Sequence, residues 1–463
     1  MSKKNTPSSA LPLRVLVVSY YYPPQNYISA LRLGKLTKYL AAYDFEPWVL
    51  TLREGLLSSA GALPVEIPEN QVIRADLGPY LTKLTQKKNS SHQLPAEASA
   101  CSEYLIKDSL MQKPHLPYLQ FFLHKIWRLI SNQFCDVRFP DRALPWVFPA
   151  IQRGSALLRQ RHFDVILSSH GPPSSHIVAA VLARRFRIPW VADYRDLWSQ
   201  NHIQRRHGSI QRFEERLEQW ILRPAAQITT VSGPLGQQLE ALHSKPVTVI
   251  QNGFDEDDFS FNERSKHSCK FKIIYTGMIY PGKRDPSLLF EAINILHNRR
   301  PDIANNVELH FFGADPQLIT DLANERNVSA HLRLHSRIAN EDALRWQQQA
   351  DLLLLLEWND HTAKGVYTGK IFEYLGARRP ILATGFPGGV IDALLRETDS
   401  GILVTNAIDA ASMIESLWHR KQREGSTRIT VSEEKLQKYT RRYQAGILAR
   451  VLRSAIRSSA ENP

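Results

Sequence analysis

The chain has 463 residues, more than one ordinary domain needs, so we expect two domains. Its net charge of +13 suits anionic lipid or phosphorylated substrates, and nucleic acid is not expected because no helix-turn-helix, zinc-finger or RNP signature is present. The cysteines Cys101, Cys135 and Cys269 are too widely spaced for a disulfide framework or a structural zinc site, and they indicate a reducing compartment.

The start of the chain does not have the pattern of an export signal. The apolar run at 13–19 is too short for the core of a signal peptide, and no apolar run approaches the length of a membrane span. The expected location is therefore cytoplasmic, with peripheral attachment to the inner face of the cell membrane left open.

Short, nearly continuous apolar runs alternate with helical stretches through the first half of the chain. Strands buried on both faces of a parallel sheet have this composition, and helical stretches such as 29–42 and 174–186 lie between them. This βαβ alternation predicts a doubly wound sheet in a first domain at 1–255. The expected strands are 14–19, 47–51, 164–168, 189–193, 227–231 and 247–251.

One region, 80–135, interrupts this alternation as a variable insert. It contains a stretch rich in Ser, Lys and Gln at 86–100, which we expect to be a mobile loop. Residues 119–130 then place apolar side chains, among them Phe122 and Trp127, at helical spacing. This amphipathic helix either covers the sheet, or it lies on an anionic membrane or guides a lipid-linked acceptor.

The alternation starts again after a polar linker at 256–270. A second domain follows at 271–430, and a final helix is expected within 431–463. Two successive Rossmann-like halves predict a cleft between them, because doubly wound sheets bind ligands beyond the carboxyl ends of their strands. The expected strands of the second domain are 271–276, 307–312, 331–334, 351–356, 380–384 and 401–404.

Polar residues follow two strands of the first domain. His170 comes after one of them, where a neutral imidazole can bond to a sugar hydroxyl or assist proton transfer. Arg195 and Asp196 follow the next strand, either as a structural ion pair or, as we favour, as part of an acceptor or donor-sugar site. Arg32, in the first helix, either contacts phosphate or is structural.

The segment 367–382 combines features that suit a nucleotide-linked ligand. Thr368 and Gly369 open a helix whose N-terminal amide groups, together with Lys370, can bind an anion. Glu373 lies about one helical turn further in, where a carboxylate can accept a pair of sugar hydroxyls. One site that holds both phosphate and ribose indicates a nucleotide.

These motifs resemble the retaining GT-B glycosyltransferases of the group 1 family, family 4. The Gly-Lys-x-Phe-Glu-Tyr-Leu motif that starts at Gly369 is similar to the family's donor segment. The Asp-x-Arg-Asp-x-Trp motif at 193–198 resembles that of members which assemble bacterial surface polysaccharides. The resemblance implies a two-domain GT-B fold in which the final helix packs back across the first domain.

The resemblance also implies how a donor diphosphate is held. Gly277 begins a loop similar to the family's Gly-Arg-x-x-x-x-Lys segment, in which Lys283 matches the lysine and Met278 stands at the arginine position. Arg284 can supply the missing cation, since charge-assisted bonds to phosphate are strong. The first of the family's two donor-site glutamates is replaced by Gly365.

Two further acidic motifs have structural and functional interpretations. Glu357 and Asp360 follow a buried strand and either take over part of the missing glutamate's role or are ordinary loop carboxylates. Asp255 and Asp257 form an Asp-x-Asp pattern, but in this family Asn-Gly-x-Asp is an interdomain signature. We therefore expect a structural role here and no metal site.

The function implied by the resemblance is that of a hexosyltransferase-type enzyme. It would move a sugar from a nucleotide-diphosphate sugar to the hydroxyl of a lipid-linked or saccharide acceptor, with retention, in polysaccharide or glycolipid assembly. No cofactor is expected beyond the donor. The alternatives are a nucleotide-sugar epimerase and a non-catalytic nucleotide-sugar-binding subunit. Expected catalytic residues are Lys283, Arg195, Asp196 and His170, and expected donor-binding residues are Gly277, Lys283, Arg284, Thr368, Gly369, Lys370 and Glu373.

Overall fold

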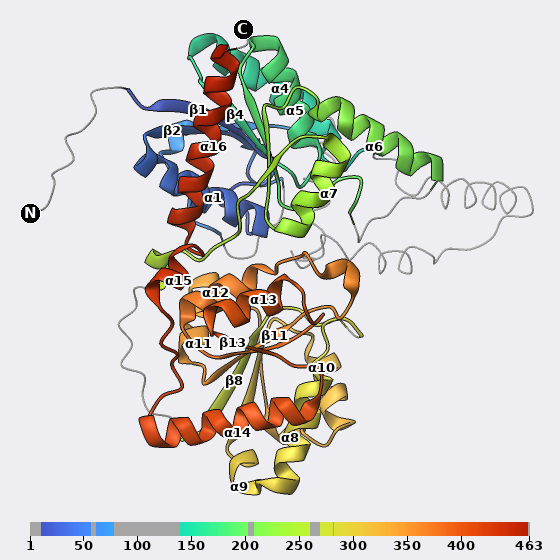
Figure 1. The fold of residues 1–463 in the computed structure, drawn as a ribbon, viewed down its shortest axis with the longest axis vertical. Helices are drawn as coiled ribbons and strands as arrows, with labels where there is room; N and C mark the ends of the chain where they lie inside the picture. The colour runs from blue at the N-terminus through green and yellow to red at the C-terminus, as the bar shows by residue number, and fades with distance from the viewer. Residues whose placement is uncertain are drawn as a thin grey trace, which may run out of the picture. The chain divides into compact units, whose positions relative to one another are not determined.

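The computed structural model describes residues 11–56, 62–77, 139–201, 208–259, 269–280 and 282–461. The chain divides into two compact units (Figure 1). Unit 1 comprises Met1–Thr229, Leu239–Thr248 and Ala449–Pro463, and unit 2 comprises Thr230–Gln238 and Val249–Leu448. The predicted insert 80–135, with its mobile loop and its amphipathic helix 119–130, lies outside the described residues.

Unit 1 is built on a seven-stranded sheet with the order β3-β2-β1-β4-β5-β6-β7. The pairings from β3 through to β5 are parallel. The strand order reverses direction between β1 and β4, so right-handed crossovers place helices on both faces. The strands are β1 (Leu13–Val18), β2 (Phe45–Leu52), β3 (Val72–Ala75), β4 (Val165–Ser169), β5 (Trp190–Tyr194), β6 (Gln227–Thr230) and β7 (Val247–Val249).

Three helices of unit 1 form one layer on this sheet. The helix α4 packs on β2, β3 and α5, and α5 packs on β1, β4, β5 and α6. The layer therefore has one side on the sheet and one side facing away from it. The helices of this half are α1 (Ile28–Leu40), α4 (Leu144–Gln160), α5 (Ser174–Phe186) and α6 (Gly208–Leu222), with 3-10 turns η1 (Ala41–Tyr43) and η2 (Glu69–Gln71). The helix α7 (Gly233–His243) starts in unit 2 and ends in unit 1.

Unit 2 contains a six-stranded sheet with the order β10-β9-β8-β11-β12-β13, and all five pairings are parallel. Its strand order also reverses once, between β8 and β11. Along β8, Ile273 and Tyr275 enter one apolar core while Ile274 enters another, which explains why the strands are apolar on both faces. The strands are β8 (Phe271–Thr276), β9 (Val307–Phe312), β10 (Leu332–His335), β11 (Leu352–Leu356), β12 (Ile381–Thr384) and β13 (Gly401–Leu403).

The helices of unit 2 connect successive strands as a doubly wound fold requires. They are α8 (Ser287–Arg299), α9 (Pro301–Ala304), α10 (Pro316–Asn324), α11 (Asn340–Gln349), α12 (Gly369–Ala377), α13 (Val390–Thr398), α14 (Ala407–Glu424) and α15 (Glu433–Gln437), with 3-10 turns η3 (Glu256–Phe259), η4 (Ser329–His331) and η5 (His361–Ala363). No helix in the described part of the chain is long and apolar enough to cross a membrane.

The chain ends in two helices where one was predicted. After α15, the helix α16 (Arg441–Glu461) starts in unit 2 and finishes in unit 1. The break has a physical cause, because Thr440 pairs with Phe254 in a β-bridge and the Arg441 amide donates to the Phe254 carbonyl at 2.8 Å. In unit 1, Arg453 donates to the carbonyl of Tyr43 at 2.6 Å, so the expected return of the last helix is confirmed.

The predicted fold of two doubly wound α/β units is confirmed. Every predicted strand is present, with each end within two residues of its predicted position. The strand β3 was missed, because it has only four residues and one of them is the charged Arg74, so its periodicity is too short to detect.

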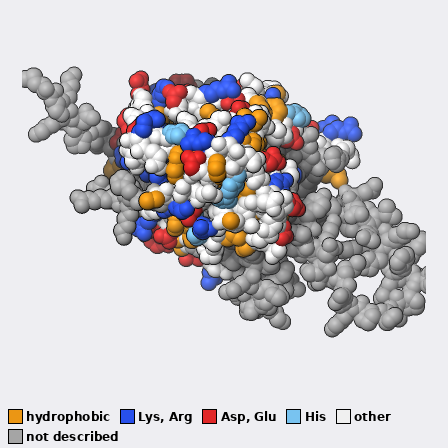
Figure 2. Space-filling model, turned by 90° about the horizontal axis from the view of Figure 1, so that it is seen from below, with side chains coloured by type: hydrophobic (Ala, Val, Ile, Leu, Met, Phe, Trp, Pro, Cys, Tyr) orange, Lys and Arg blue, Asp and Glu red, His pale blue; other side chains and the backbone are white. Residues whose placement is uncertain are grey.

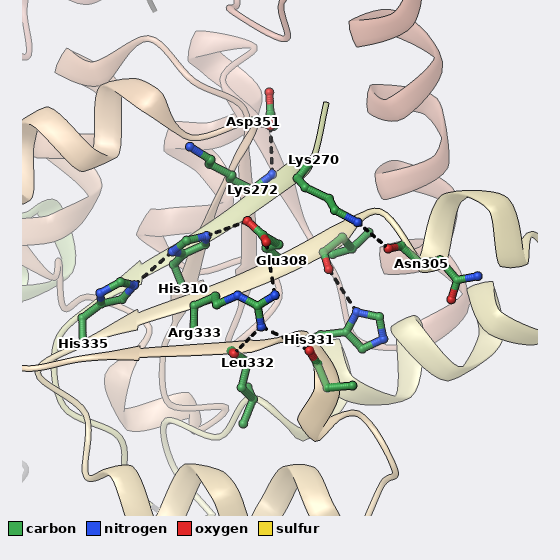
Figure 3. Close-up of polar contacts among 12 residues, drawn as sticks. Lys270, Lys272, Asn305, Glu308, His310, His331, Leu332, Arg333, His335 and Asp351 are labelled. Atoms are coloured by element: carbon green, nitrogen blue, oxygen red, sulfur yellow. Dashed lines mark hydrogen bonds and ion pairs between the residues drawn. The ribbon is translucent and has the colours of Figure 1, made fainter. Parts of the chain in front are cut away.

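Polar contacts cover an edge of the second sheet (Figure 3). His310 Nδ1 on β9 lies 3.0 Å from His335 Nε2 on β10, and Arg333 donates to Glu308 at 3.2 Å. Burial lowers the pKa of His310 to about 4, so its imidazole is neutral at physiological pH. We infer that these contacts between β9 and β10 hold the edge strand β10 in place.

Candidate functional site

The loop after β8 and the start of α12 come together in unit 2. Gly277 has a φ of +136°, and its amide donates to the Phe312 carbonyl at 2.8 Å. The ammonium of Lys370 lies directly against Gly277, so a side chain at position 277 would collide with it. The same ammonium lies 5.2 Å from the centre of the Tyr275 ring. Two motifs that are separated by about ninety positions in the sequence therefore form one local structure.

The first turn of α12 presents backbone donors beside this lysine. Thr368 is the N-cap residue with an extended backbone, and its side chain makes no capping hydrogen bond. Gly369 is the first helical residue, and Lys370 is the second. An uncapped helix start beside a cation favours an anionic ligand.

Glu373 lies one turn further along α12 and is partly buried. Gln347 on α11 donates to Glu373 Oε2 at 3.1 Å and to Thr276 Oγ1 at 3.2 Å. Burial raises the pKa of Glu373, while the Gln347 hydrogen bond and the nearby Lys370 act in the opposite direction. The carboxylate is thus held in position by a second side chain.

Gln347 was not predicted from the sequence. Its side chain is fully buried, and its amide oxygen has no hydrogen-bond partner among the described residues. It is the first of three consecutive glutamines at the end of a polar helix, so nothing in the local sequence distinguishes it from its neighbours.

Lys283 and Arg284 lie at the carboxyl end of β11, next to the point where the second sheet reverses. A tight turn places them there, with the amides of both residues donating to the Tyr280 carbonyl. The Lys283 ammonium lies 4.1 Å from the centre of the Trp358 ring, and Arg284 pairs with Glu357 at 3.4 Å. Tyr275 and Met278 fix the start of the same loop through a 2.7 Å hydrogen bond.

Gly365 occupies a position that has no room for the family's first glutamate. Its carbonyl accepts a 2.6 Å hydrogen bond from Ser232, and a Cβ atom here would lie 2.8 Å from Cβ of Pro234. Of the two substitutes considered, Asp360 caps η5 by accepting from the Thr362 amide at 2.8 Å, while Glu357 pairs with Arg284. Glu357, which lies beside Arg284, is therefore the better candidate to take over part of the missing glutamate's role.

The Asp-x-Asp pattern takes part in local structure. Gly253 packs so closely on the Tyr439 carbonyl that a Cβ atom would lie 2.5 Å from it, and Arg441 donates to Asn252 at 3.2 Å. Asp255 accepts from the Asp257 amide at 3.2 Å as η3 begins. No cluster of three or more potential metal ligands occurs within the described ranges.

His170 lies at the carboxyl end of β4 in unit 1, where the first sheet reverses. Its ring is buried and stacks on Tyr194 at a centroid distance of 5.3 Å. Burial lowers the pKa of His170 to about 4, with Arg195 lowering it further and Asp196 opposing the shift. The imidazole is therefore a neutral hydrogen-bonding group.

Arg195 and Asp196 are partly exposed next to this histidine. Arg195 Nε donates to Asp196 Oδ2 at 2.8 Å, and a Cβ atom on Gly171 would lie 3.9 Å from Arg195 Nη2. Three residues predicted from two separate loops, His170, Arg195 and Asp196, thus lie close together in unit 1.

Arg32 and Asp193 have a structural role. Both side chains are buried, and they pair through Arg32 Nη2 and Asp193 Oδ1 at 2.9 Å. Thr229 also donates to Asp193 Oδ1 at 2.9 Å. The interpretation of Arg32 as a phosphate ligand is not supported, because its guanidinium is enclosed and paired.

Two glutamates of α6 hold the loop that carries Arg195, and neither was predicted. Glu218 accepts from the Tyr194 hydroxyl at 2.7 Å and from the Ser199 amide at 2.9 Å, so it fixes both ends of the loop. Glu214 accepts from Trp198 Nε1 at 3.1 Å. Glutamates four residues apart on a helix usually indicate a solvated face, so only the tertiary structure reveals this role.

Two family models match this chain. Residues 112–258 match the model described as Glycosyltransferase Family 4, and residues 270–420 match the model described as Glycosyl transferases group 1. The two matches together span more than half of the chain. No curated protein matches it.

Solved structures with a similar fold align along almost the whole chain. A sucrose-phosphate synthase from Thermosynechococcus elongatus is 13% identical, with 96% of this chain and 100% of that chain covered and a TM-score of 0.58. The HepE protein of Anabaena in complex with UDP is 15% identical, with 97% and 99% covered and a TM-score of 0.53. A glycosyltransferase from Rickettsia africae ESF-5 is 11% identical, with 96% and 99% covered and a TM-score of 0.55. At these identities the likeness shows the fold.

Proposed function

We propose that this chain, which belongs to the group 1 (family 4) glycosyltransferases, transfers a sugar from a nucleotide-diphosphate donor to an acceptor hydroxyl. The transfer is of the hexosyl type, retains the anomeric configuration, and serves polysaccharide or glycolipid assembly. The observation that carries this proposal is the arrangement in unit 2, where Lys370 and the start of α12 lie against Gly277 and Glu373 is held one turn away.

The donor binds through two chemically distinct parts of this arrangement. The amides after Thr368 and the ammonium of Lys370 bind the diphosphate, which Lys283 and Arg284 approach from the β8–α8 loop. Glu373, held by Gln347, accepts the ribose hydroxyls. As the bond to the sugar breaks, negative charge develops on the leaving diphosphate, and these cations stabilise it.

The acceptor is handled by unit 1. His170 is neutral, so one ring nitrogen can donate a hydrogen bond and the other can accept one. Arg195 and Asp196 offer a donor and an acceptor next to it. The departing phosphate accepts the proton of the acceptor hydroxyl, so no protein base is required.

The proposal includes neither a metal nor a further cofactor, because the cations of unit 2 can offset the charge of the diphosphate. The acceptor is a lipid-linked or saccharide hydroxyl. We also propose that the protein works in the cytoplasm, attached peripherally to the inner face of the cell membrane.

Two measurements test this function in sequence. UDP, GDP, ADP and TDP are first compared for their effect on the melting temperature, since a ligand that binds only the folded state raises it. UDP is the first candidate, because the HepE structures contain UDP and UDP-glucose. The labelled sugar nucleotide of the stabilising base is then incubated with membrane extract. Transfer of label to lipid or polysaccharide supports the proposal, whereas conversion of the nucleotide sugar to an epimer overturns it.

A non-catalytic nucleotide-sugar-binding subunit is the second candidate. The observation that favours it is Gly365, which packs on Pro234 where the family has a carboxylate. Stabilisation by a nucleotide with no transfer to any acceptor would select this alternative.

A further inference from the structure

The helical layer formed by α4, α5 and α6 in unit 1 has an outer face that carries large exposed side chains. Phe148 on α4 is 68% exposed, and Phe213 and Trp220 on α6 are 58% and 60% exposed. In the described part of the chain, every strongly exposed Phe or Trp lies on this face. Leu144 and Val181 are exposed on the same helices. Aromatic groups that are this exposed indicate a surface that is covered in use.

The charges of the same face have one sign. The three helices contain six arginines, and all six are exposed, whereas Glu214 and Glu218 are buried and Glu215 is partly buried. Glu215 also accepts a hydrogen bond from Gln211 at 2.9 Å. The three helices therefore carry exposed positive charge, and none of their carboxylates is strongly exposed. The arginines are Arg153, Arg159, Arg184, Arg185, Arg212 and Arg216.

Arginine and aromatic side chains are interleaved on this face. The Arg184 guanidinium lies 4.9 Å from the centre of the Trp220 ring and donates to the Trp220 carbonyl at 3.2 Å, which joins α5 to α6. The side of the molecule shown in Figure 2 differs, because acidic and basic side chains are mixed there. Tryptophan, phenylalanine and arginine together are typical of helices that lie in a membrane interface.

We propose that the outer face of α4, α5 and α6 docks on an anionic lipid bilayer. Phe148, Phe213 and Trp220 enter the headgroup region, and the surrounding arginines contact lipid phosphates. A second copy of the chain does not suit this face, since a symmetric dimer would bring the two sets of arginines together. The inference rests on the proposed membrane location but not on sugar transfer, and it identifies the surface that makes the contact.

Charge and apolar contact contribute separately, so each can be removed by itself. The test uses the full chain and co-sedimentation with vesicles of phosphatidylcholine alone or mixed with phosphatidylglycerol. We expect binding only to the anionic vesicles, weakened by salt. The double variant R212Q/R216Q should lose roughly tenfold or more in binding, because each arginine near an anionic surface contributes about 1 kcal/mol. The double variant F148S/W220S should lose a similar amount.

A matched control is I408S, which replaces a side chain of unit 2 that is 52% exposed and should leave vesicle binding unchanged. Equal binding to both kinds of vesicle, or F148S/W220S binding as well as I408S, would overturn the proposal. A lower melting temperature of F148S/W220S with unchanged vesicle binding would overturn it as well, because it would show that protein covers this face. The effect of UDP on the melting temperature is measured on the same samples, so a failure of donor binding is distinguished from a failure of docking.

Discussion

The two sheets reverse their strand order in the same way, but the side chains at the two reversal points differ in charge. In unit 2, Lys283 and Arg284 lie at the reversal point, and Lys370 lies against Gly277 at the start of the same loop. In unit 1 the buried charges Arg32 and Asp193 neutralise each other, and His170 at the end of β4 is a neutral imidazole. In the proposed function, the same topology therefore serves an anion site in one unit and a site for uncharged hydroxyls in the other.

The largest effect is expected from removing the anion site. We expect K370M to reduce kcat roughly a hundredfold or more, because a positioned cation that stabilises a developing charge is lost. Transfer from labelled nucleotide sugar measures this. K435M is the matched control, since Lys435 lies on α15, where it pairs with Asp399 outside the proposed site, and it should retain activity. Equal activity of the two variants would show that unit 2 does not stabilise the leaving group through Lys370.

A smaller effect is expected from loosening the loop in unit 1. In E218Q the side chain has one acceptor oxygen in place of two, so it can no longer accept from both the Ser199 amide and the Tyr194 hydroxyl, at a cost of about 1–3 kcal/mol. We expect kcat to fall about tenfold while nucleotide affinity, which belongs to unit 2, is unchanged. E215Q on the same helix is the control. A parallel loss of nucleotide affinity would indicate general unfolding instead of a displaced loop.

The pH dependence of nucleotide binding tests the ribose carboxylate. Burial raises the pKa of Glu373, and only the ionised form accepts hydrogen bonds from both ribose hydroxyls, so affinity should fall as the pH decreases through this raised pKa. Q347M removes a hydrogen bond that stabilises the carboxylate. We expect the fall to begin at a higher pH and the Kd at neutral pH to rise about tenfold. Titration of nucleotide at several pH values measures both, and Q348M, which should behave as wild type, is the control.

The smallest effect is expected from chelation. Because cationic side chains offset the diphosphate charge in our account, EDTA should leave the transfer rate unchanged. A loss of activity with EDTA, restored by Mg²⁺ or Mn²⁺, would contradict this part of the proposal.

The sequence predicted the two units, and which loop residues lie close together, better than it predicted which side chains hold those loops. Strands such as β11, Leu352–Leu356, are apolar on both faces, so local composition is sufficient to find them. The residues Lys370 and Glu373 were found because helix periodicity relates them to each other. By contrast, Gln347 and Glu218 act across distances of 26 and 24 positions in the sequence, and local patterns carry no information about such contacts.

The roles of positions 365 and 32 also became interpretable only in three dimensions. The sequence shows that position 365 lacks a carboxylate, but the contact of Gly365 with Pro234 explains why a side chain does not fit. Arg32 was open to a phosphate role until its buried pair with Asp193 was seen. In both cases the deciding partner is distant in sequence.

The central claim is that unit 2 binds a nucleoside diphosphate through Lys370 and Glu373. The most direct test compares the melting temperature of the wild type and of the K370M/E373Q double variant with and without saturating UDP or the preferred diphosphate. The account predicts a rise of several degrees for the wild type at about a hundredfold excess over Kd, and no rise for the double variant. An equal rise in both proteins would contradict it.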